Sequence, residues 1–143
     1  MIETLNIKGT EDSPEVIMDF QKGFIRISGT SWLEDAYSFY EPLYQWVSEY
    51  FKAPQKVTEI EFGYTYFNTS SAKQIAKLVT LISNFKSRSE VKVKWFYENG
   101  DSEMLKSGKK YSELLDLGFE FVEIESTTEP EDEDEGVYKI VNK

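Results

Sequence analysis

The sequence predicts an α/β fold in which a mixed β-sheet carries its helices mainly on one face. Strand-like and helix-like patterns alternate along most of the chain, and such alternation arises from crossover connections between at least partly parallel strands. The chain of 143 residues has the length of one domain. Its hydrophobic content of 40% is typical of a chain that forms a core.

The first part of the chain has the pattern of short strands. Residues 2–7 alternate apolar and polar side chains, as a half-buried strand does. Residues 15–19 and 24–29 are joined by a turn at Gly23 and form an N-terminal hairpin.

Helices and strands then alternate in a βαβαβ arrangement. Apolar side chains between residues 36 and 51 recur at helical spacing, with Asp35 or Glu34 near the helix start. Pro42 leaves two possibilities: a kinked helix, or a main segment that begins at Pro42. The later elements are a helical stripe over 75–85, a weaker helix over 104–117 with Gly118 as its C-cap, and strands over 57–67, 91–97 and 119–124.

The strand of residues 57–67 is the longest of these patterns. Strict alternation predicts that five of its side chains share one face of the sheet. These are Thr58, Ile60, Phe62, Tyr64 and Tyr66.

The sequence contains no histidine and no cysteine. Ser-His-Asp and Cys-His catalysis and zinc sites built on imidazole or thiolate are therefore excluded. A general base near neutral pH would have to be a perturbed carboxylate or lysine. A carboxylate-dependent enzyme is thus the weakest of the functional hypotheses, and we expect no catalytic residue, no metal and no cofactor.

The net charge of −10 is unevenly distributed. Residues 1–122 hold 18 acidic and 14 basic side chains (−4), and residues 123–143 hold 8 and 2 (−6). Nucleic acid is a poor partner for such a chain, because phosphate binding needs a basic face. The acidic run 125–136 predicts a domain of residues 1–124 followed by a mobile tail of residues 125–143.

The chain carries no targeting signal that we recognise. No apolar run approaches the roughly 20 residues of a transmembrane helix, and residues 1–10 lack the basic and apolar regions of a secretory signal. We therefore expect a cytoplasmic protein without membrane insertion.

The segment YFNTSSAK, residues 66–73, raises the main functional question. Asparagine, serine and threonine are preferred helix N-caps, but only one or two of Asn68, Thr69, Ser70 and Ser71 can cap one helix. We expect the cap to come from Asn68 and the serines, Ser70 and Ser71, which leaves Thr69 as the hydroxyl to modify. The segment also ends a strand and opens a helix, where α/β sheets place their sites. Free amides and the helix dipole favour an anion there, and Lys73 adds a cation one turn inside.

Several other stretches of the sequence, together with YFNTSSAK, carry a resemblance to a known family. They are Ile7-Lys8-Gly9-Thr10 with Pro14, Gly29-Thr30-Ser31 with Glu34 and Tyr37, Trp46 with Tyr50, and VKVKWFYE at residues 91–98. With YFNTSSAK as the most specific element, residues 1–122 resemble the SiaC family of bacterial regulatory phosphoproteins. That family is similar in shape to the STAS-domain anti-sigma-factor antagonists, so the resemblance implies a single STAS-like domain. The acidic tail lies outside it.

The resemblance implies a partner switch without catalytic activity. In this family the threonine that matches Thr69 is reversibly phosphorylated by a serine/threonine kinase and a PP2C-type phosphatase. The unmodified protein then binds a target such as a diguanylate cyclase, in cyclic di-GMP and biofilm control. A phosphate adds about −1.5 to −2 charges, which a partner that buries Thr69 would not tolerate. We place Tyr66, Phe67, Thr69 and Ser70 in the partner-binding surface.

A second hypothesis also uses this helix start. A domain of the same shape can bind a small ligand or an anion at the amides of residues 68–71. Phosphorylation by a kinase separates the first hypothesis from this one.

Overall fold

The computed structural model describes residues 3–125, which form one sheet and the helices that cover it. The acidic segment over residues 126–143, for which the sequence predicts a mobile tail, lies outside the described residues. In chain order, the elements are β1 (Leu5–Ile7), β2 (Glu15–Asp19), β3 (Phe24–Ser31), α1 (Ala36–Tyr50), β4 (Val57–Phe67), α2 (Thr69–Phe85), the 3-10 helix η1 (Lys86–Arg88), β5 (Glu90–Glu98), α3 (Ser102–Leu115) and β6 (Glu120–Ile124).

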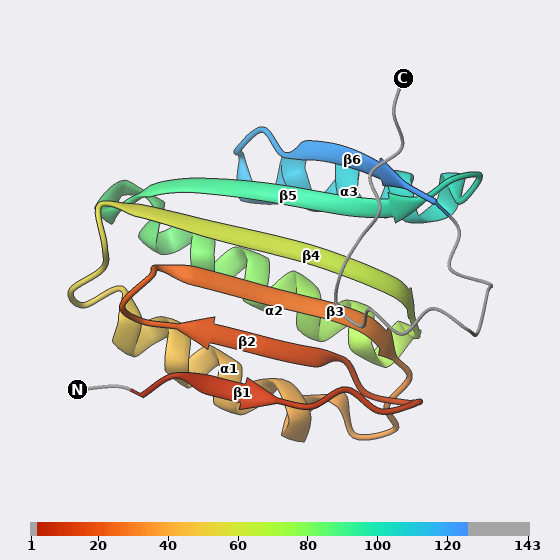
Figure 1. Ribbon diagram of the computed structural model, residues 1–143, viewed down its shortest axis with the longest axis horizontal. Coiled ribbons are helices and arrows are strands. Elements are labelled where there is room, and N and C mark those ends of the chain that lie inside the picture. The colour runs from red at the N-terminus through yellow and green to blue at the C-terminus, as the bar shows by residue number, and fades with distance from the viewer. Residues whose placement is uncertain (1–2, 126–143) are drawn as a thin grey trace.

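The strands lie side by side in chain order, β1-β2-β3-β4-β5-β6, and the three α-helices lie behind one face of the sheet (Figure 1). β1, β2 and β3 pair antiparallel. β3, β4, β5 and β6 pair parallel, and each parallel pair is joined through one helix. The predicted mixed sheet with an N-terminal hairpin and helices on one face is confirmed. We call the face without helices the open face.

The hairpin between β2 and β3 depends on Gly23. Its φ of +63° lies in the left-handed region, which glycine adopts without strain. A Cβ at this position would also lie 2.8 Å from the Tyr50 hydroxyl and 2.8 Å from the Val57 carbonyl oxygen. Any other residue would therefore push the hairpin away from the end of α1.

The core lies between the sheet and the helices, with Trp95 as its largest fully buried side chain. The indole N–H of Trp95 donates to the Met104 carbonyl at 3.0 Å, so the buried ring keeps a hydrogen-bond partner. Gly108 of α3 lies directly over this ring, and a Cβ there would lie only 2.5 Å from it. The glycine allows α3 to pack closely on β5.

Helix α1 begins at Ala36 with Asp35 as its N-cap, because the Asp35 carboxylate accepts from the Ser38 amide at 3.1 Å. Hydrogen bonds from the Ser38 side chain and amide hold the pKa of Asp35 below its usual value. The helix continues through Pro42, so the alternative in which Pro42 opens the main segment is wrong. Pro42 and Ser38 are both exposed, and water can therefore satisfy the carbonyl that Pro42 leaves without a helical donor.

Helix α3 ends earlier than the sequence predicts. Its last residue is Leu115, and Asp116 is the C-cap in the left-handed conformation, with φ 55° and ψ 50°. The prediction of Gly118 as C-cap is therefore wrong. The Lys86 ammonium, directly after α2, donates to the carbonyls of Leu115 and Asp116 at 2.9 and 2.8 Å. These bonds provide donors for carbonyl groups at the end of α3 that have no partner within the helix.

A β-bulge near the end of β4 changes which side chains face the helices. The register pairs Gly29 with Tyr64 but Thr30 with Tyr66, so Thr65 is an additional residue in β4. The rings of Tyr64 and Phe67 then lie 5.4 Å apart on the helix side, whereas Tyr66 is 49% exposed. The prediction that Tyr64 and Tyr66 share a face is wrong, because one extra residue shifts the alternation.

Candidate functional site

The candidate site lies where β3 and β4 end beside each other. The amide of Asn68, the first residue after β4, donates to the carbonyl of Ser31, the last residue of β3, at 3.1 Å. The amide of Trp32 donates to the Asp12 carbonyl at 2.8 Å. Three segments that are distant in the sequence therefore meet at this edge, and the stretches that carry the resemblance contribute to all of them.

Asn68 is the N-cap of α2. Its side-chain oxygen accepts from the Ser71 amide at 2.9 Å, and its side-chain N–H donates to the Leu33 carbonyl at 3.1 Å. One side chain thus satisfies the first turn of α2 and also holds the loop after β3. The sequence predicts capping by Asn68 together with Ser70 and Ser71. Asn68 is the N-cap, but the prediction for the serines is wrong: both lie inside α2, and the Ser71 hydroxyl is bonded to Ser31.

The three hydroxyl groups after Asn68 differ sharply in accessibility. Thr69, the first residue of α2, is exposed, and Ser70 is half-buried. Ser71 is fully buried, and its hydroxyl donates to the Ser31 carbonyl at 2.9 Å. Among these three residues, Thr69 is the most exposed.

A chain of hydroxyl groups runs beneath the start of α2. Ser31 donates to Ser71 at 2.8 Å, and Tyr40 and Tyr64 extend the chain with distances of 2.9 and 3.0 Å. Because each hydroxyl has one proton, Tyr64 donates to Tyr40, Tyr40 to Ser31, Ser31 to Ser71, and Ser71 to the Ser31 carbonyl. Burial raises the pKa of both Tyr40 and Tyr64, so these phenols stay protonated as donors. The chain ties β3, β4, α1 and α2 together under the site.

Basic side chains lie along α2 next to Thr69. Lys73 is exposed and follows Thr69 by four residues, so both side chains lie on the same side of the helix. Lys77 follows one turn later, with its ammonium 5.6 Å from the centroid of the Tyr37 ring. A negative group on Thr69 would therefore lie near the positive end of the helix dipole and near a lysine.

Two exposed aromatic rings adjoin the site. Trp32 is 63% exposed and Tyr66 is 49% exposed, and their rings meet edge to face with centroids 6.0 Å apart. Phe67, which the sequence analysis also places in the partner surface, packs instead towards Tyr64 and Tyr111. We call Trp32 and Tyr66 the aromatic pair. Sequence reasoning missed Trp32, because only its exposure in the fold distinguishes it from a core residue.

A hollow of about 490 Å³ adjoins the aromatic pair and is lined by Asp12, Trp32, Leu33 and Glu34. The two carboxylates, both on exposed residues, give it a negative lining. A small anion is therefore disfavoured in this hollow.

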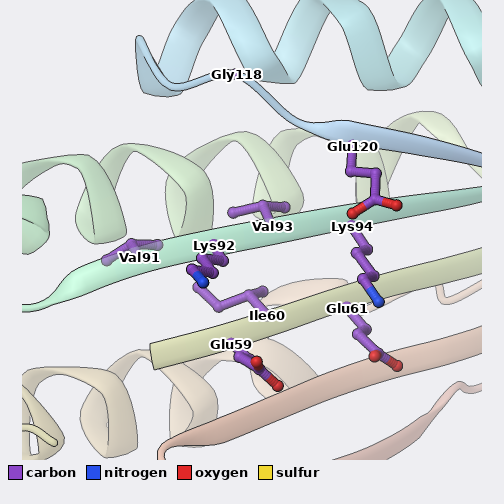
Figure 2. A pocket seen from close by; sticks show the side chains of 9 residues that line it. All are labelled: Glu59, Ile60, Glu61, Val91, Lys92, Val93, Lys94, Gly118 and Glu120. Atoms are coloured by element: carbon purple, nitrogen blue, oxygen red, sulfur yellow. The ribbon is translucent and has the colours of Figure 1, made fainter. Parts of the chain in front are cut away.

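A second hollow, of about 260 Å³, lies on the open face (Figure 2). The register places Glu59 beside Lys92 and Glu61 beside Lys94, and Lys94 also lies beside Glu120. Opposite charges thus alternate across the strands and largely compensate one another. Within residues 3–125, no group of three or more acidic side chains is placed to hold a metal ion. No helix of that same part of the chain is long and apolar enough to cross a membrane.

The fold and the site define a class of protein: a single α/β domain that presents a hydroxyl at a helix start beside exposed aromatic rings. The model of the SiaC family regulatory phosphoproteins matches residues 7–124, and the chain belongs to this family.

Solved structures of the family have the same fold. The chain is similar to apo-SiaC from Pseudomonas aeruginosa, with a TM-score of 0.73 and 24% identity over 87% of this chain and 100% of that one. It is also similar to SiaC in the crystal structure of the diguanylate cyclase SiaD with its activator SiaC, from the same organism. There the TM-score is 0.73 and the identity 26%, over 83% of this chain and 97% of that one.

The chain also has a similar sequence to an uncharacterised protein of Pseudomonas aeruginosa (strain UCBPP-PA14). The two are 25% identical over 118 residues, which is 82% of this chain and 92% of that protein.

Proposed function

We propose that this protein is a partner switch controlled by reversible phosphorylation of Thr69. The observation that carries the proposal is the exposure of Thr69 at the start of α2, next to a fully buried Ser71. The family is one of regulatory phosphoproteins, and Thr69 is the accessible hydroxyl of its first helical turn. A serine/threonine kinase adds the phosphate in this proposal, and a PP2C-type phosphatase removes it.

The unphosphorylated protein binds its target through the surface around Thr69. The related SiaC binds and activates a diguanylate cyclase, and an enzyme of that class is the target that we propose here. Trp32 and Tyr66 provide the anchors, because exposed aromatic rings at the centre of an interface often supply much of its binding energy. Phe67 packs on Tyr64 and Tyr111 and Ser70 is half-buried, so in this proposal they contribute less to the binding surface than the aromatic pair.

Phosphorylation leaves the fold intact but prevents binding. The phosphate adds about −1.5 to −2 charges, which the start of α2 and Lys73 accommodate within the chain. A partner surface that covers Thr69 would have to remove water from this charge.

Phosphorylation and binding are tested separately. A cognate kinase with ATP, followed by phosphopeptide mass spectrometry, should modify the unaltered chain and the Thr80→Ala variant but not Thr69→Ala. Thr80 is an exposed threonine of the same helix and serves as the matched control. Modification that persists in Thr69→Ala would exclude Thr69 as the acceptor.

Binding to a diguanylate cyclase is then measured with and without the phosphate. We expect phosphorylation to weaken binding by about tenfold or more, because the charge must be buried at the interface. Trp32→Ala and Tyr66→Ala should each weaken binding by about 2 kcal/mol, while Leu114→Ala, at a side chain of similar exposure (48%) on α3, should not. Equal affinities of the two phosphorylation states would refute the switch.

The alternative of a small-anion site at residues 68–71 is less well supported. Asn68 already occupies the Ser71 amide, and the adjoining hollow is lined by two carboxylates. A thermal-shift screen with phosphate and nucleotides should therefore show no stabilisation.

A further inference from the structure

The hollow beside the aromatic pair combines an exposed aromatic ring with negative charge. It has a volume of about 490 Å³ and is lined by Asp12, Trp32, Leu33 and Glu34. The Trp32 side chain is 63% exposed, and its contact with the Tyr66 ring extends the aromatic surface beyond the hollow. Asp12 and Glu34 are both exposed. We call this feature the acidic hollow.

Hydrogen bonds hold the backbone around the acidic hollow in place. The Trp32 amide donates to the Asp12 carbonyl at 2.8 Å, and the Asp12 amide donates to the Thr10 hydroxyl at 3.2 Å. The Asn68 side chain donates to the Leu33 carbonyl at 3.1 Å. Because these bonds lie within the domain, the acidic hollow is formed before a partner arrives, which lowers the entropy that binding must spend on ordering.

The charges of the acidic hollow are not compensated within the domain. Among the ion pairs found in residues 3–125, none includes Asp12 or Glu34. On the open face, by contrast, the register places acidic and basic side chains beside each other. Two carboxylates at one hollow repel each other, and a cation from outside would relieve this repulsion.

An arginine side chain fits this lining. Its planar guanidinium stacks on aromatic rings, and tryptophan is the most favourable ring for such a contact. Its N–H groups form a fork that donates to carboxylates with two bonds at once. It is also less strongly hydrated than the ammonium of lysine, so it enters an interface at a lower desolvation cost. An apolar side chain would remove water from the carboxylates without replacing it.

We propose that the acidic hollow receives an arginine side chain of the protein partner. The guanidinium stacks on the Trp32 ring, and the carboxylates of Asp12 and Glu34 accept its N–H groups. This inference rests on the proposed partner switch, because it specifies the chemistry of the partner at that surface. It predicts a positively charged partner surface, which complements the acidic domain and fixes the orientation of the complex.

A small probe tests the acidic hollow without the partner. N-acetyl-arginine amide is titrated into the 15N-labelled full chain, and NMR follows the indole N–H signal of Trp32. Trp32→Phe identifies this signal, and the buried Trp46 and Trp95 provide internal references. N-acetyl-citrulline amide is the matched control ligand, because it has nearly the same shape without the charge.

We expect the arginine compound to shift the Trp32 signal with a dissociation constant of about 10 mM. The citrulline compound should bind at least about fivefold more weakly, because it lacks charge-assisted hydrogen bonds. Asp12→Asn combined with Glu34→Gln should weaken arginine binding by about fivefold or more. Glu103→Gln combined with Glu113→Gln removes the same charge from exposed positions of α3 and should leave it unchanged. Circular dichroism checks the fold of both double variants.

The same double variants are then tested with a diguanylate cyclase. The Asp12 and Glu34 double variant should bind the cyclase about tenfold or more weakly than the unaltered chain. This difference should shrink as salt is raised from about 0.1 to 0.5 M, because salt screens exposed charges. The α3 double variant should bind like the unaltered chain.

Three results would overturn the inference. The first is the absence of a shift at Trp32, or equal shifts with the arginine and citrulline compounds. The second is undiminished arginine binding by the Asp12 and Glu34 double variant. The third is equal affinity of this variant and the unaltered chain for the cyclase, which would leave the partner switch standing.

Failure of the proposed partner switch gives a different result. If the unaltered chain bound no cyclase while the arginine compound still shifted the Trp32 signal with the expected preference, the proposed target would be wrong. The preference of the acidic hollow for arginine would be supported in that case.

Discussion

Ser71→Ala tests the chain of hydroxyl groups beneath Thr69. The Ser71 hydroxyl accepts from the Ser31 hydroxyl at 2.8 Å and donates to the Ser31 carbonyl at 2.9 Å. Its removal leaves the Ser31 proton without its acceptor. If the chain of donors reverses, the proton without an acceptor is then that of Tyr64, which is only 3% exposed. A buried donor without a partner costs about 1–3 kcal/mol, and the lost bond to the carbonyl about 1 kcal/mol.

We therefore expect Ser71→Ala to lower the free energy of unfolding by about 2–4 kcal/mol. For a domain of this size, the melting temperature should fall by about 6–12 °C. Tyr64→Phe removes the donor at the other end of the chain and leaves only an acceptor unpaired, so its cost should be about 1 kcal/mol. Ser70→Ala, at a half-buried neighbour, should change stability by no more than about 0.5 kcal/mol.

Urea denaturation followed by circular dichroism measures these differences, with calorimetry for the melting temperatures. Unchanged m-values would show that the midpoints report stability alone. Our reasoning would be refuted if Tyr64→Phe destabilised the protein as much as Ser71→Ala. That result would mean that the hydroxyl protons do not run from Tyr64 to the Ser31 carbonyl.

Three further predictions concern packing, capping and pH. Gly108→Ala places a methyl group 2.5 Å from Trp95. This substitution should lower the free energy of unfolding by about 2–3 kcal/mol and shift the tryptophan fluorescence. Gly118→Ala, which places its methyl group in open space, should have neither effect. Asn68→Ala removes the α2 cap and should cost about 1–2 kcal/mol in urea denaturation, so an unchanged midpoint would contradict the cap. Burial raises the pKa of Tyr111 from 10.0 to about 12. Between these pH values the folded chain keeps a proton that the unfolded chain loses. The contribution of Tyr111 to the free energy of unfolding should therefore be fully present below pH 10 and be lost as the pH rises towards 12. Absorbance at 295 nm checks this, and full phenolate formation near pH 10 with unchanged circular dichroism would contradict it.

Local sequence patterns were sufficient for most elements of the fold. The strand predicted over residues 57–67 has the same limits as β4, because its alternation and its flanking polar residues both mark the ends. Asn68 was a predictable cap, since its side chain acts only on the next turn of the backbone. The end of α3 was missed because Lys86, 29 residues before Leu115 in the sequence, holds that carbonyl.

The aromatic pair shows why part of the site needed the structure. The alternation pattern put Tyr66 with the core residues, and only the extra residue Thr65 in β4 brings it to the other face. Trp32 carries no local signal of exposure, and its contact with Tyr66 joins residues from two different strand ends. The difference between Thr69 and Ser71 likewise depends on Ser31, 40 residues earlier in the chain than Ser71.

The sequence by itself determined the α/β class, the mixed sheet, the cap at Asn68 and the family resemblance. Each of these depends on side-chain periodicity or on short motifs, which act between residues close together in the chain. Only the tertiary structure decided which hydroxyl of residues 69–71 is accessible and which aromatic rings stand beside it. Those properties depend on contacts between β3, β4, α1 and α2, because burial is set by whatever packs against a side chain, wherever in the sequence it lies.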